Sequence, residues 1–380
     1  MDIEPGSACS DRGNYSDANK MMEKMLIIVL AIFCFQLLLS IWLIVLSKRK
    51  KAQSGFFLDQ LSVIIPFRDE EKRIEQLIHS LNDLEMNTEL ATEFIFVDDH
   101  SSDQTAEIIR QKMLLPYRLI TAHETGKKAA IHEGVKAAGY NYVLTLDADV
   151  ELHRLFFQQL ATLPEADMWV LPVKMKGTNL IAKLGSVDFR WIQLLTRALI
   201  NSGHPFFANG ANLLFSKSLY LKTAPLRTDH KEVSGDDLFL LAAFKKEGAR
   251  INTTADSHLS VTTAAPSSFK ALLQQRKRWA FKMNKLITKE VVFFAAFLFI
   301  VECGMFLSLM GLFYSAYFLI PISIKLGVEG CLYRAEKRTF KWTDLLVLLL
   351  HQIWFPFYLL AIMFWPLPPE NKWAKKEVIH

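Results

Sequence analysis

The stretch that decides the fold of this chain is Tyr142-Val143-Leu144-Thr145-Leu146-Asp147-Ala148-Asp149. Its first five residues form a mainly apolar run, which predicts a strand buried in a sheet, and two carboxylates follow it, one residue apart. At the end of a buried strand, an Asp-x-Asp pair can offer one oxygen to Mg²⁺ or Mn²⁺ and another to a sugar or ribose. Many surface loops contain Asp-x-Asp by chance, so solvated turn carboxylates are the alternative interpretation.

Short apolar runs alternate with amphipathic stretches of helix length on both sides of this motif. The runs cover residues 61–67, 93–97, 117–122, 142–146 and 168–173. This alternation predicts an α/β domain with a mostly parallel sheet. In such sheets, ligands bind outside the carboxyl ends of the strands.

Acidic residues follow three of the predicted strands at these carboxyl ends. They are Asp69 and Glu70, Asp98 and Asp99, and Asp147 and Asp149. Three acidic strand ends on one rim would repel each other without a cation. We therefore expect a cation at this rim.

A turn at Gly126-Lys127 opens another predicted helix. A lysine there can neutralise a phosphate with help from the helix N-terminus, although a solvated lysine is an equally ordinary interpretation. The chain has neither the Gly-x-x-x-x-Gly-Lys-Ser/Thr spacing of a P-loop nor a Gly-x-Gly-x-x-Gly motif. The sequence therefore argues against NAD or FAD as a cofactor.

Residues 25–46 carry no charged side chain and predict a membrane anchor. At about 1.5 Å per residue the segment spans roughly 33 Å, enough to cross a bilayer. It is followed by Lys48-Arg49-Lys50-Lys51 in place of a signal-peptide cleavage site, so we expect the anchor to be retained. Basic residues mark the cytoplasmic side, which puts the N-terminus outside and the chain after Lys48 in the cytoplasm.

Two more apolar stretches cover residues 291–324 and 345–365. The first is too long for one crossing and predicts two helices that break around residues 304–311. This gives four crossings in all. Lysines in the C-terminal tail would prefer the cytoplasm and fit three crossings instead; they are Lys372, Lys375 and Lys376.

The charge and the cysteines narrow the class of protein further. The net charge is +5, and much of it lies beside the apolar stretches, which fits a membrane surface better than a nucleic acid. We expect no nucleic-acid partner. The four cysteines form no Cys-x-x-Cys pair, so a disulfide scaffold or a zinc site is not expected.

Six short motifs follow one another between residues 60 and 280. They are Val63-Ile64-Ile65-Pro66-Phe67-Arg68-Asp69-Glu70, Val97-Asp98-Asp99-His100-Ser101, Gly126-Lys127, Asp147-Ala148-Asp149, Ser234-Gly235-Asp236-Asp237 and Gln275-Arg276-Lys277-Arg278-Trp279. In order and spacing the set resembles the family-2 glycosyltransferases, and Gln-x-x-Arg-Trp before a membrane segment is most similar to the membrane-bound branch. The resemblance implies a Rossmann-like GT-A fold, a UDP- or GDP-sugar donor, a divalent cation and inversion at the anomeric carbon.

The resemblance also implies a role for each matching residue on the donor side. The donor-binding residues would be Pro66, Arg68, Asp69, Asp98, Asp99, Lys127, Asp147, Gln275, Arg278 and Trp279. Asp147 and Asp149 would hold Mg²⁺ or Mn²⁺, which neutralises the charge that builds on the departing diphosphate.

On the acceptor side, Asp237, or alternatively Asp236, resembles the catalytic base that takes the proton of the acceptor hydroxyl. The alternative is a helix cap before residues 238–241. Trp279 can stack on an acceptor sugar, and Arg278 can pair with diphosphate oxygens. Without the resemblance, this segment would be interpreted as an amphipathic helix at a membrane surface.

The sequence thus predicts six segments in order. They are an N-terminal tail (1–24), a transmembrane anchor (25–46), a basic linker (47–60), a GT-A domain (61–288), a C-terminal transmembrane region (289–366) and a C-terminal tail (367–380). The transmembrane region would hold two helices in 291–324 and one in 345–365. We expect an integral protein of the cytoplasmic or inner membrane, with its catalytic domain in the cytoplasm.

The expected function is a metal-dependent, membrane-anchored inverting glycosyltransferase of polysaccharide or cell-envelope biosynthesis, acting on a lipid-linked or glycan acceptor. One alternative is a processive polysaccharide synthase with export, for which Glu302, His351 and Gln352 are the obvious channel-lining residues. Another is a catalytically silent nucleotide-sugar-binding scaffold. The intact carboxylates at Asp147, Asp149, Asp236 and Asp237 argue against the scaffold.

Overall fold

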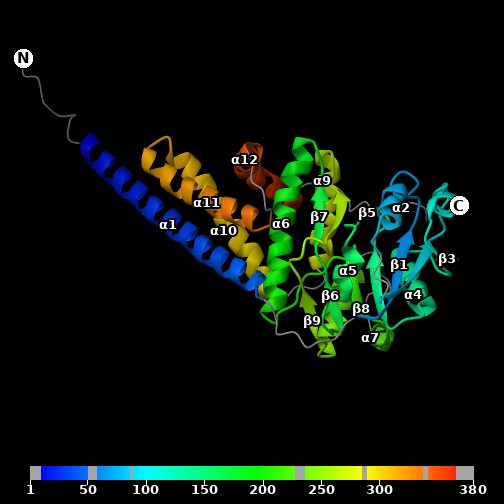
Figure 1. The fold of residues 1–380 in the computed structure, drawn as a ribbon. Helices are drawn as coiled ribbons and strands as arrows, with labels where there is room; N and C mark the ends of the chain where they lie inside the picture. Colours follow the sequence, from blue (N-terminus) through cyan, green and yellow to red (C-terminus); the bar gives the residue numbers. More distant parts are fainter. Residues whose placement is uncertain are drawn as a thin grey trace, which may run out of the picture. The chain divides into compact units, whose positions relative to one another are not determined.

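The computed structural model describes residues 10–49, 58–85, 89–226, 236–284, 289–336 and 341–364. The chain divides into an α/β unit within residues 45–285 and a helical unit formed from residues up to 44 and residues 286–365. Figure 1 shows the order of the elements along the chain.

The α/β unit is built on a sheet whose described strands follow the order β3-β2-β1-β4-β8-β6-β9 (Figure 1). The strands are β1 (Gln60–Phe67), β2 (Ala91–Asp98), β3 (Tyr117–Thr121), β4 (Tyr142–Leu146), β6 (Met168–Val170), β8 (Asn212–Ser216) and β9 (Ile251–Thr253). β1 is parallel to β2 and β4, whereas β8 is antiparallel to both of its neighbours. The predicted mostly parallel sheet is confirmed.

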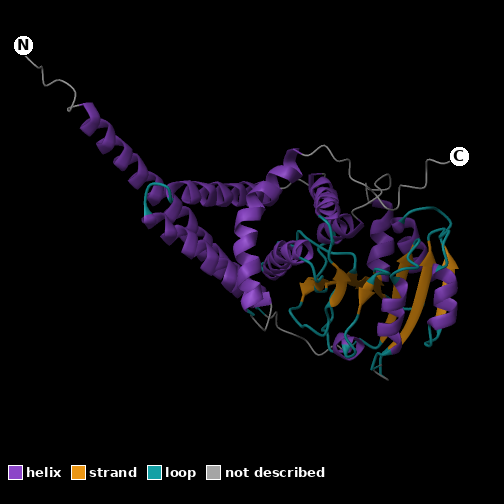
Figure 2. Ribbon diagram, turned by 90° about the horizontal axis from the view of Figure 1, so that it is seen from above, coloured by secondary structure: helices purple, strands orange, loops and turns teal. Residues whose placement is uncertain are grey.

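Helices cover both faces of this sheet (Figure 2). They include α2 (Ile74–Asn82), α3 (Thr105–Lys112) and α5 (Phe156–Ala161) on one face, and α4 (Lys127–Ala137), α7 (Lys217–Thr223) and α8 (Asp236–Lys246) on the other. A short 3-10 turn, η1 (Ala224–Leu226), follows α7. The sheet is therefore a buried layer, which explains why its strands are nearly continuous apolar runs.

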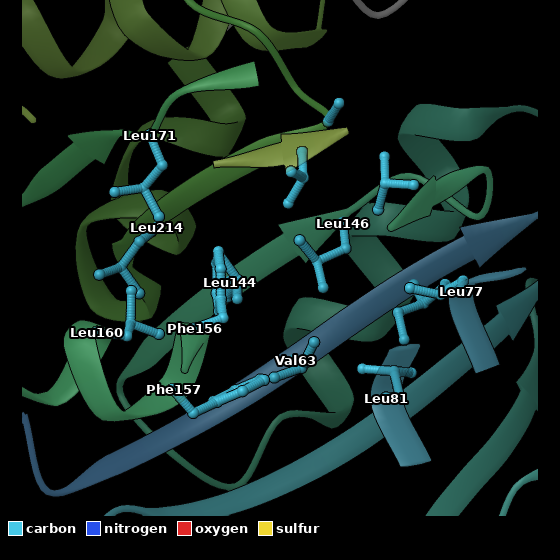
Figure 3. Close-up of a cluster of buried hydrophobic side chains, with 14 of the residues drawn as sticks. Val63, Leu77, Leu81, Leu144, Leu146, Phe156, Phe157, Leu160, Leu171 and Leu214 are labelled. Carbon is cyan, nitrogen blue, oxygen red and sulfur yellow. The ribbon is translucent and has the colours of Figure 1, made fainter. Parts of the chain in front are cut away.

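Alternate residues of β1 serve the two cores. Val63 and Ile65 pack with α2 and α5 on one face, while Ile64 packs against α4 on the other. Figure 3 shows the first of these cores, in which Val63 lies near Phe157 and residues of α2. Because both faces of β1 are buried, a one-residue slip would exchange its two sets of core side chains, and its carboxyl end is firmly placed.

A second, smaller sheet has the order β5-β10-β7, with β5 (Val150–Glu151), β7 (Val173–Lys176) and β10 (Val261–Ala264). The prediction of one strand over residues 168–173 is wrong, because β6 ends at Val170 and β7 begins at Val173 in the other sheet. Pro172 lies between them and has no N–H to donate to a sheet ladder. Its carbonyl instead accepts hydrogen bonds from Val261 N and Asn212 Nδ2.

Two longer helices complete the α/β unit, α6 (Leu180–Asn201) and α9 (Phe269–Asn284). α6 begins directly after Asn179. Asn179 caps it, its side chain accepting a hydrogen bond from Ala182 N at 2.8 Å. More than half of α6 is buried, with an apolar stripe packed into the domain core.

The helical unit contains α1 (Ser10–Ser47) up to residue 44, α10 (Lys289–Gly311), η2 (Ala316–Phe318), α11 (Leu319–Glu336) and α12 (Trp342–Phe364). Three segments of the described chain are long and apolar enough to cross a membrane: Asn19–Ser47, Ala316–Ala335 and Trp342–Ile362. The apolar part of α10, Ala296–Gly311, is shorter. Four crossings therefore stay a prediction.

The break between the two helices falls within the predicted interval, at its last residue. α10 continues through Gly304 and ends at Gly311, and the chain turns before η2. At Gly311 a Cβ would lie 2.5 Å from the ring of Phe318, so only glycine permits the close return of the chain. Close packing does not require glycine at position 304, because a Cβ there would lie at an ordinary contact distance from its nearest neighbours.

Candidate functional site

Three parallel strands bring the predicted donor-binding residues to one edge of the sheet. β1 pairs in register with β2, so that Phe67 lies opposite Asp98, and β1 also pairs with β4. The carboxyl ends of these strands therefore lie side by side. Pro66 is the penultimate residue of β1, and Asp98 is the last residue of β2.

Asp99 is the most deeply buried acid of this edge, with no exposed surface. Its Oδ2 receives a hydrogen bond from Arg68 Nη1 at 3.3 Å, and its Oδ1 receives one from Gly126 N at 2.7 Å. Burial raises the pKa of Asp99 above its ordinary value, while the Gly126 N–H and the Arg68 guanidinium oppose this shift. Asp99 therefore joins the end of β1 to the turn before α4.

That turn places Lys127 beside Asp147. Gly126 adopts a φ of +116°, a conformation that side-chain-bearing residues rarely take, and α4 begins at the next residue. Lys127 Nζ donates to Asp147 Oδ1 at 2.5 Å, with both side chains partly exposed. A continuous line of contacts thus leads from Arg68 through Asp99 and Gly126 to Lys127 and Asp147.

Asp149 is paired with an arginine that the sequence analysis did not single out. Arg73 Nη1 donates to Asp149 Oδ2 at 3.0 Å, and the same guanidinium contacts Glu70. The only signal in the sequence was a basic residue soon after a strand end. Arg68, Arg73 and Lys127 thus already pair with three of the acids at the strand ends. The expected cation at this rim stays a prediction.

The loops after β1 and β2 are joined by their own polar side chains. Asp69 Oδ1 accepts a hydrogen bond from Ser102 N at 2.8 Å, and Asp98 Oδ1 accepts one from Ser101 N at 2.8 Å. Asp69 and His100 have φ values of +52° and +55°, in the left-handed region. The Asp69–Ser102 contact thus ties the loop after β1 to the loop after β2.

Asp237 lies in the first turn of α8 and faces a cavity. Its Oδ2 accepts from Gly210 N at 3.3 Å and its Oδ1 from Leu238 N at 2.9 Å. The cavity is lined by Lys128, Ile131, Thr145, Gly210, Leu213, Phe215, Tyr220, Asp237 and Leu240. Thr145 belongs to β4, so Asp237 lies near the strand that leads to Asp147. Asp236 begins α8, but its side chain lies outside the described residues.

Gln275, Arg278 and Trp279 form a second group, on α9. Trp279 packs against the domain core and lies 5.6 Å from the Phe189 ring, centroid to centroid. Gln275 Oε1 accepts a hydrogen bond from Arg276 Nη1 at 2.7 Å. The contact between Trp279 and Phe189 packs this part of α9 against α6.

Asp147 and Asp149 have the chemistry that a divalent cation needs. Among the described residues, Asp147 Oδ2 and Asp149 Oδ1 accept no hydrogen bond, so each carboxylate keeps a hard oxygen donor. Carboxylate oxygens are the ligands that Mg²⁺ prefers. No group of three or more His, Cys, Asp or Glu in the described part of the chain is arranged to hold a metal.

Two protein families match overlapping parts of this chain. The family described as Glycosyl transferase family 2 matches residues 62–173, and Glycosyl transferase family group 2 matches residues 142–368. A 4,4'-diaponeurosporenoate glycosyltransferase of Staphylococcus haemolyticus is 36% identical over 107 residues, which are 27% of this chain and 28% of that protein. The Staphylococcus aureus (strain USA300) protein of the same name is 33% identical over 97 residues, 25% of each chain. The chain thus spans about a quarter of these relatives' length.

Among solved structures, the mannosyltransferase PcManGT from Pyrobaculum calidifontis, in complex with GDP-Man and Mn²⁺, has a TM-score of 0.53 at 17% identity. The match covers 88% of this chain and 99% of that one, and it shows the same fold. The GT-A fold predicted from the sequence is confirmed. Because the second family match alone spans more than half of the chain, this protein belongs to the family-2 glycosyltransferases.

Proposed function

We propose that the chain transfers a sugar, with inversion at the anomeric carbon, from a UDP- or GDP-sugar to a lipid-linked or glycan acceptor. The observation that carries this proposal is the line of contacts from Arg68 through Asp99 and Lys127 to Asp147. It lies at the carboxyl edge of three parallel strands, where ligands of such sheets bind. The structurally similar mannosyltransferase contains GDP-Man and Mn²⁺, which supports this class of donor.

In this proposal the nucleoside lies over the ends of β1 and β2. Pro66 and the loop residues Asp69 and Asp98 would shape the pocket, and the buried Asp99 would hold the Arg68 guanidinium beside the base or ribose. Lys127 lies at the first turn of α4, so its ammonium and the helix N-terminus both favour the diphosphate.

Asp147 and Asp149 would hold Mg²⁺ or Mn²⁺ through the carboxylate oxygens that are not hydrogen-bonded in the described structure. Such a cation supplies positive charge where negative charge builds on the leaving diphosphate. The chain contributes to the same end through Lys127 and Arg278, which are both suited to pair with phosphate oxygens.

Asp237 is the proposed base. Inverting transfer needs a carboxylate across the sugar ring from the leaving group, to take the proton of the attacking acceptor hydroxyl. The backbone N–H groups of Gly210 and Leu238 each hold one oxygen of Asp237 in place beside the cavity. Asp236 is the alternative base. Gln275 would form a hydrogen bond with either substrate, and Trp279 would stack on the acceptor sugar or close the donor pocket.

The proposed membrane arrangement keeps the six segments predicted above, with the GT-A domain over residues 61–288 in the cytoplasm. The basic residues after α1 support this side, and helices that could span a membrane occur before and after the domain.

Processive export of a polysaccharide is less well supported. Glu302, His351 and Gln352 are all buried within the helical unit, and Glu302 pairs with Lys325 at 2.8 Å, so these groups serve internal packing.

The experiment is a donor screen of the detergent-solubilised full chain, which measures release of UDP or GDP from a panel of nucleotide sugars. We expect one donor to be turned over with Mg²⁺ or Mn²⁺, and not in excess EDTA. Asp147→Asn should remove turnover, while Asp83→Asn, at the exposed residue that follows α2, should leave it unchanged. Equal turnover of the Asp147 variant and the wild type would refute the proposed site.

A further inference from the structure

A buried ion pair joins α6 to α9 beneath the Gln275–Trp279 motif. Arg276 and Asp188 are both more than nine-tenths buried. Arg276 Nε donates to Asp188 Oδ2 at 3.0 Å, and Nη2 donates to Asp188 Oδ1 at 2.9 Å, which makes a two-pronged contact. Nη2 also donates to Gly185 O at 2.7 Å. A charge this deeply buried is stable only when it is so fully paired.

Gly185 lies against Leu272 of α9. A Cβ at this position would lie 2.8 Å from Leu272 Cδ1, so a larger residue would force the Leu272 side chain to shift. The carbonyl of Gly185 and the carboxylate of Asp188 both come from α6 and bind the same guanidinium. The sequence offered a signal for this contact, since Asp188 is a lone acid in a mostly apolar helix.

The same guanidinium touches both neighbours that the proposed function uses. Arg276 Nη1 donates to Gln275 Oε1 at 2.7 Å, and the guanidinium carbon lies 4.2 Å from the centre of the Trp279 ring. Trp279 is held from another direction by Phe189, the residue after Asp188. One side chain thus fixes the amide of Gln275 and the plane of Trp279.

The hydrogen bond from Arg276 also determines which way the amide oxygen and the NH₂ group of Gln275 point. An arginine has only N–H donors, so the atom that faces it must be the amide oxygen of Gln275. The NH₂ group of Gln275 therefore points elsewhere, and it makes no hydrogen bond within the described residues. It is suited to donate to an oxygen of a sugar hydroxyl or a phosphate.

We infer that Arg276, anchored by Asp188 and the Gly185 carbonyl, is a positioning residue that presents the NH₂ group of Gln275 and the face of Trp279 to the substrates. Arg276 itself does not touch them. The inference rests on the proposed transfer reaction and assigns a role to a residue between the motif's recognised positions. It also assigns the Gln275 amide as a hydrogen-bond donor to substrate oxygen.

The test is a double-mutant cycle on the full chain in detergent, read as kcat/KM for the donor found by the screen. Arg276→Lys keeps the charge beside Asp188 but cannot reach Gln275 and Asp188 with a planar fork. We expect it to lower kcat/KM by about 10- to 100-fold, the worth of a charge-assisted hydrogen bond. Lys277→Gln, at the next position, should leave kcat/KM within about twofold of the wild type.

The cycle separates positioning from a merely structural role. If Arg276 acts through Gln275, then Arg276→Lys should cause little further loss in a Gln275→Ala background. Equal losses in both backgrounds would overturn the inference. A wild-type chain that turns over no nucleotide sugar would instead refute the proposed function, so the two failures are distinguishable.

A second variant keeps the inference testable if Arg276→Lys does not fold. Gln275→Glu retains an acceptor for Arg276 Nη1 and leaves the Arg276–Asp188 pair intact, so the melting temperature should be kept. It replaces the NH₂ donor by a carboxylate oxygen, which can only accept a hydrogen bond and adds a negative charge. We expect kcat/KM to fall by about tenfold or more, and full activity in this folded variant would show that Gln275 does not donate to a substrate.

Discussion

Replacing Lys127 by methionine tests the centre of the proposed site, because two effects of opposite sign are expected. Lys127 Nζ lies 2.5 Å from Asp147 Oδ1, and its side chain is 20% exposed. At a partly exposed site the effective dielectric constant is about 20, for which two charges about 4 Å apart interact by about 4 kcal/mol before desolvation. The net worth of such a charge-assisted contact is about 1.5–3 kcal/mol.

The first expected effect is weaker binding of the donor. Without its ammonium, Lys127→Met should raise the Kd of UDP or GDP by roughly 10- to 100-fold, since a diphosphate loses one cationic partner. The second effect is tighter binding of Mn²⁺ in the absence of nucleotide, because Asp147 no longer shares its oxygen with a lysine. Calorimetry for the nucleotide and electron paramagnetic resonance for Mn²⁺ measure the two affinities separately.

Lys136→Met is the matched control, because Lys136 lies on the same helix and pairs with Glu133 on an exposed face. It should change neither affinity by more than about twofold. If Lys127→Met leaves the nucleotide Kd unchanged, Lys127 does not face the diphosphate. If Mn²⁺ affinity falls instead of rising, the lysine and the cation do not compete for Asp147.

Three further outcomes test other parts of the molecule. Asp237→Asn should lower kcat by about 10²- to 10⁴-fold while leaving nucleotide affinity nearly intact; an unchanged kcat would move the base to Asp236. Because burial raises the pKa of Asp99, the free energy of unfolding of the wild type should fall relative to Asp99→Asn as the pH rises above 3.8, and parallel melting curves from pH 4 to 7 would contradict this. Lys325→Met should destabilise the helical unit by about 3–5 kcal/mol, since it leaves the buried Glu302 and Glu329 without their ammonium. Thermal unfolding in detergent checks this, and adding Glu302→Gln and Glu329→Gln should restore much of the loss.

In the helical unit, the local sequence predicted the helices but not the exact residue at which the first of the C-terminal helices ends. Its apolar stretches predicted helices correctly, because a long uncharged run can satisfy its backbone groups only within a helix. The turn between α10 and α11 was predicted only to within residues 304–311, and α10 ends at Gly311. Both Gly304 and Gly311 were candidates for a break, and the choice depends on the Phe318 ring that returns to lie against Gly311.

In the candidate site, the local sequence likewise predicted where the strands end but not which residues pair with the acids that follow them. The strand ends at Phe67, Asp98 and Leu146 could be predicted, since each is the point where an apolar run meets polar residues. The basic partners of the acids could not. Arg73 pairs with Asp149 and Arg276 with Asp188 across 76 and 88 residues of the chain, and no local pattern encodes such a pairing.

The sequence by itself determined the alternating strands and helices, the carboxylates at the strand ends and the family to which the chain belongs. These features can be predicted because they depend on the order of residue types along the chain. Strands and helices bury residues at characteristic spacings, so their apolar residues recur with the same spacings in the sequence. Only the tertiary structure decided that Lys127 meets Asp147, that β6 and β7 lie in different sheets, and that Arg276 holds Gln275 and Trp279. The physical reason is that a buried charge or polar group must find a partner in space, and the folded backbone alone determines which partner is within reach.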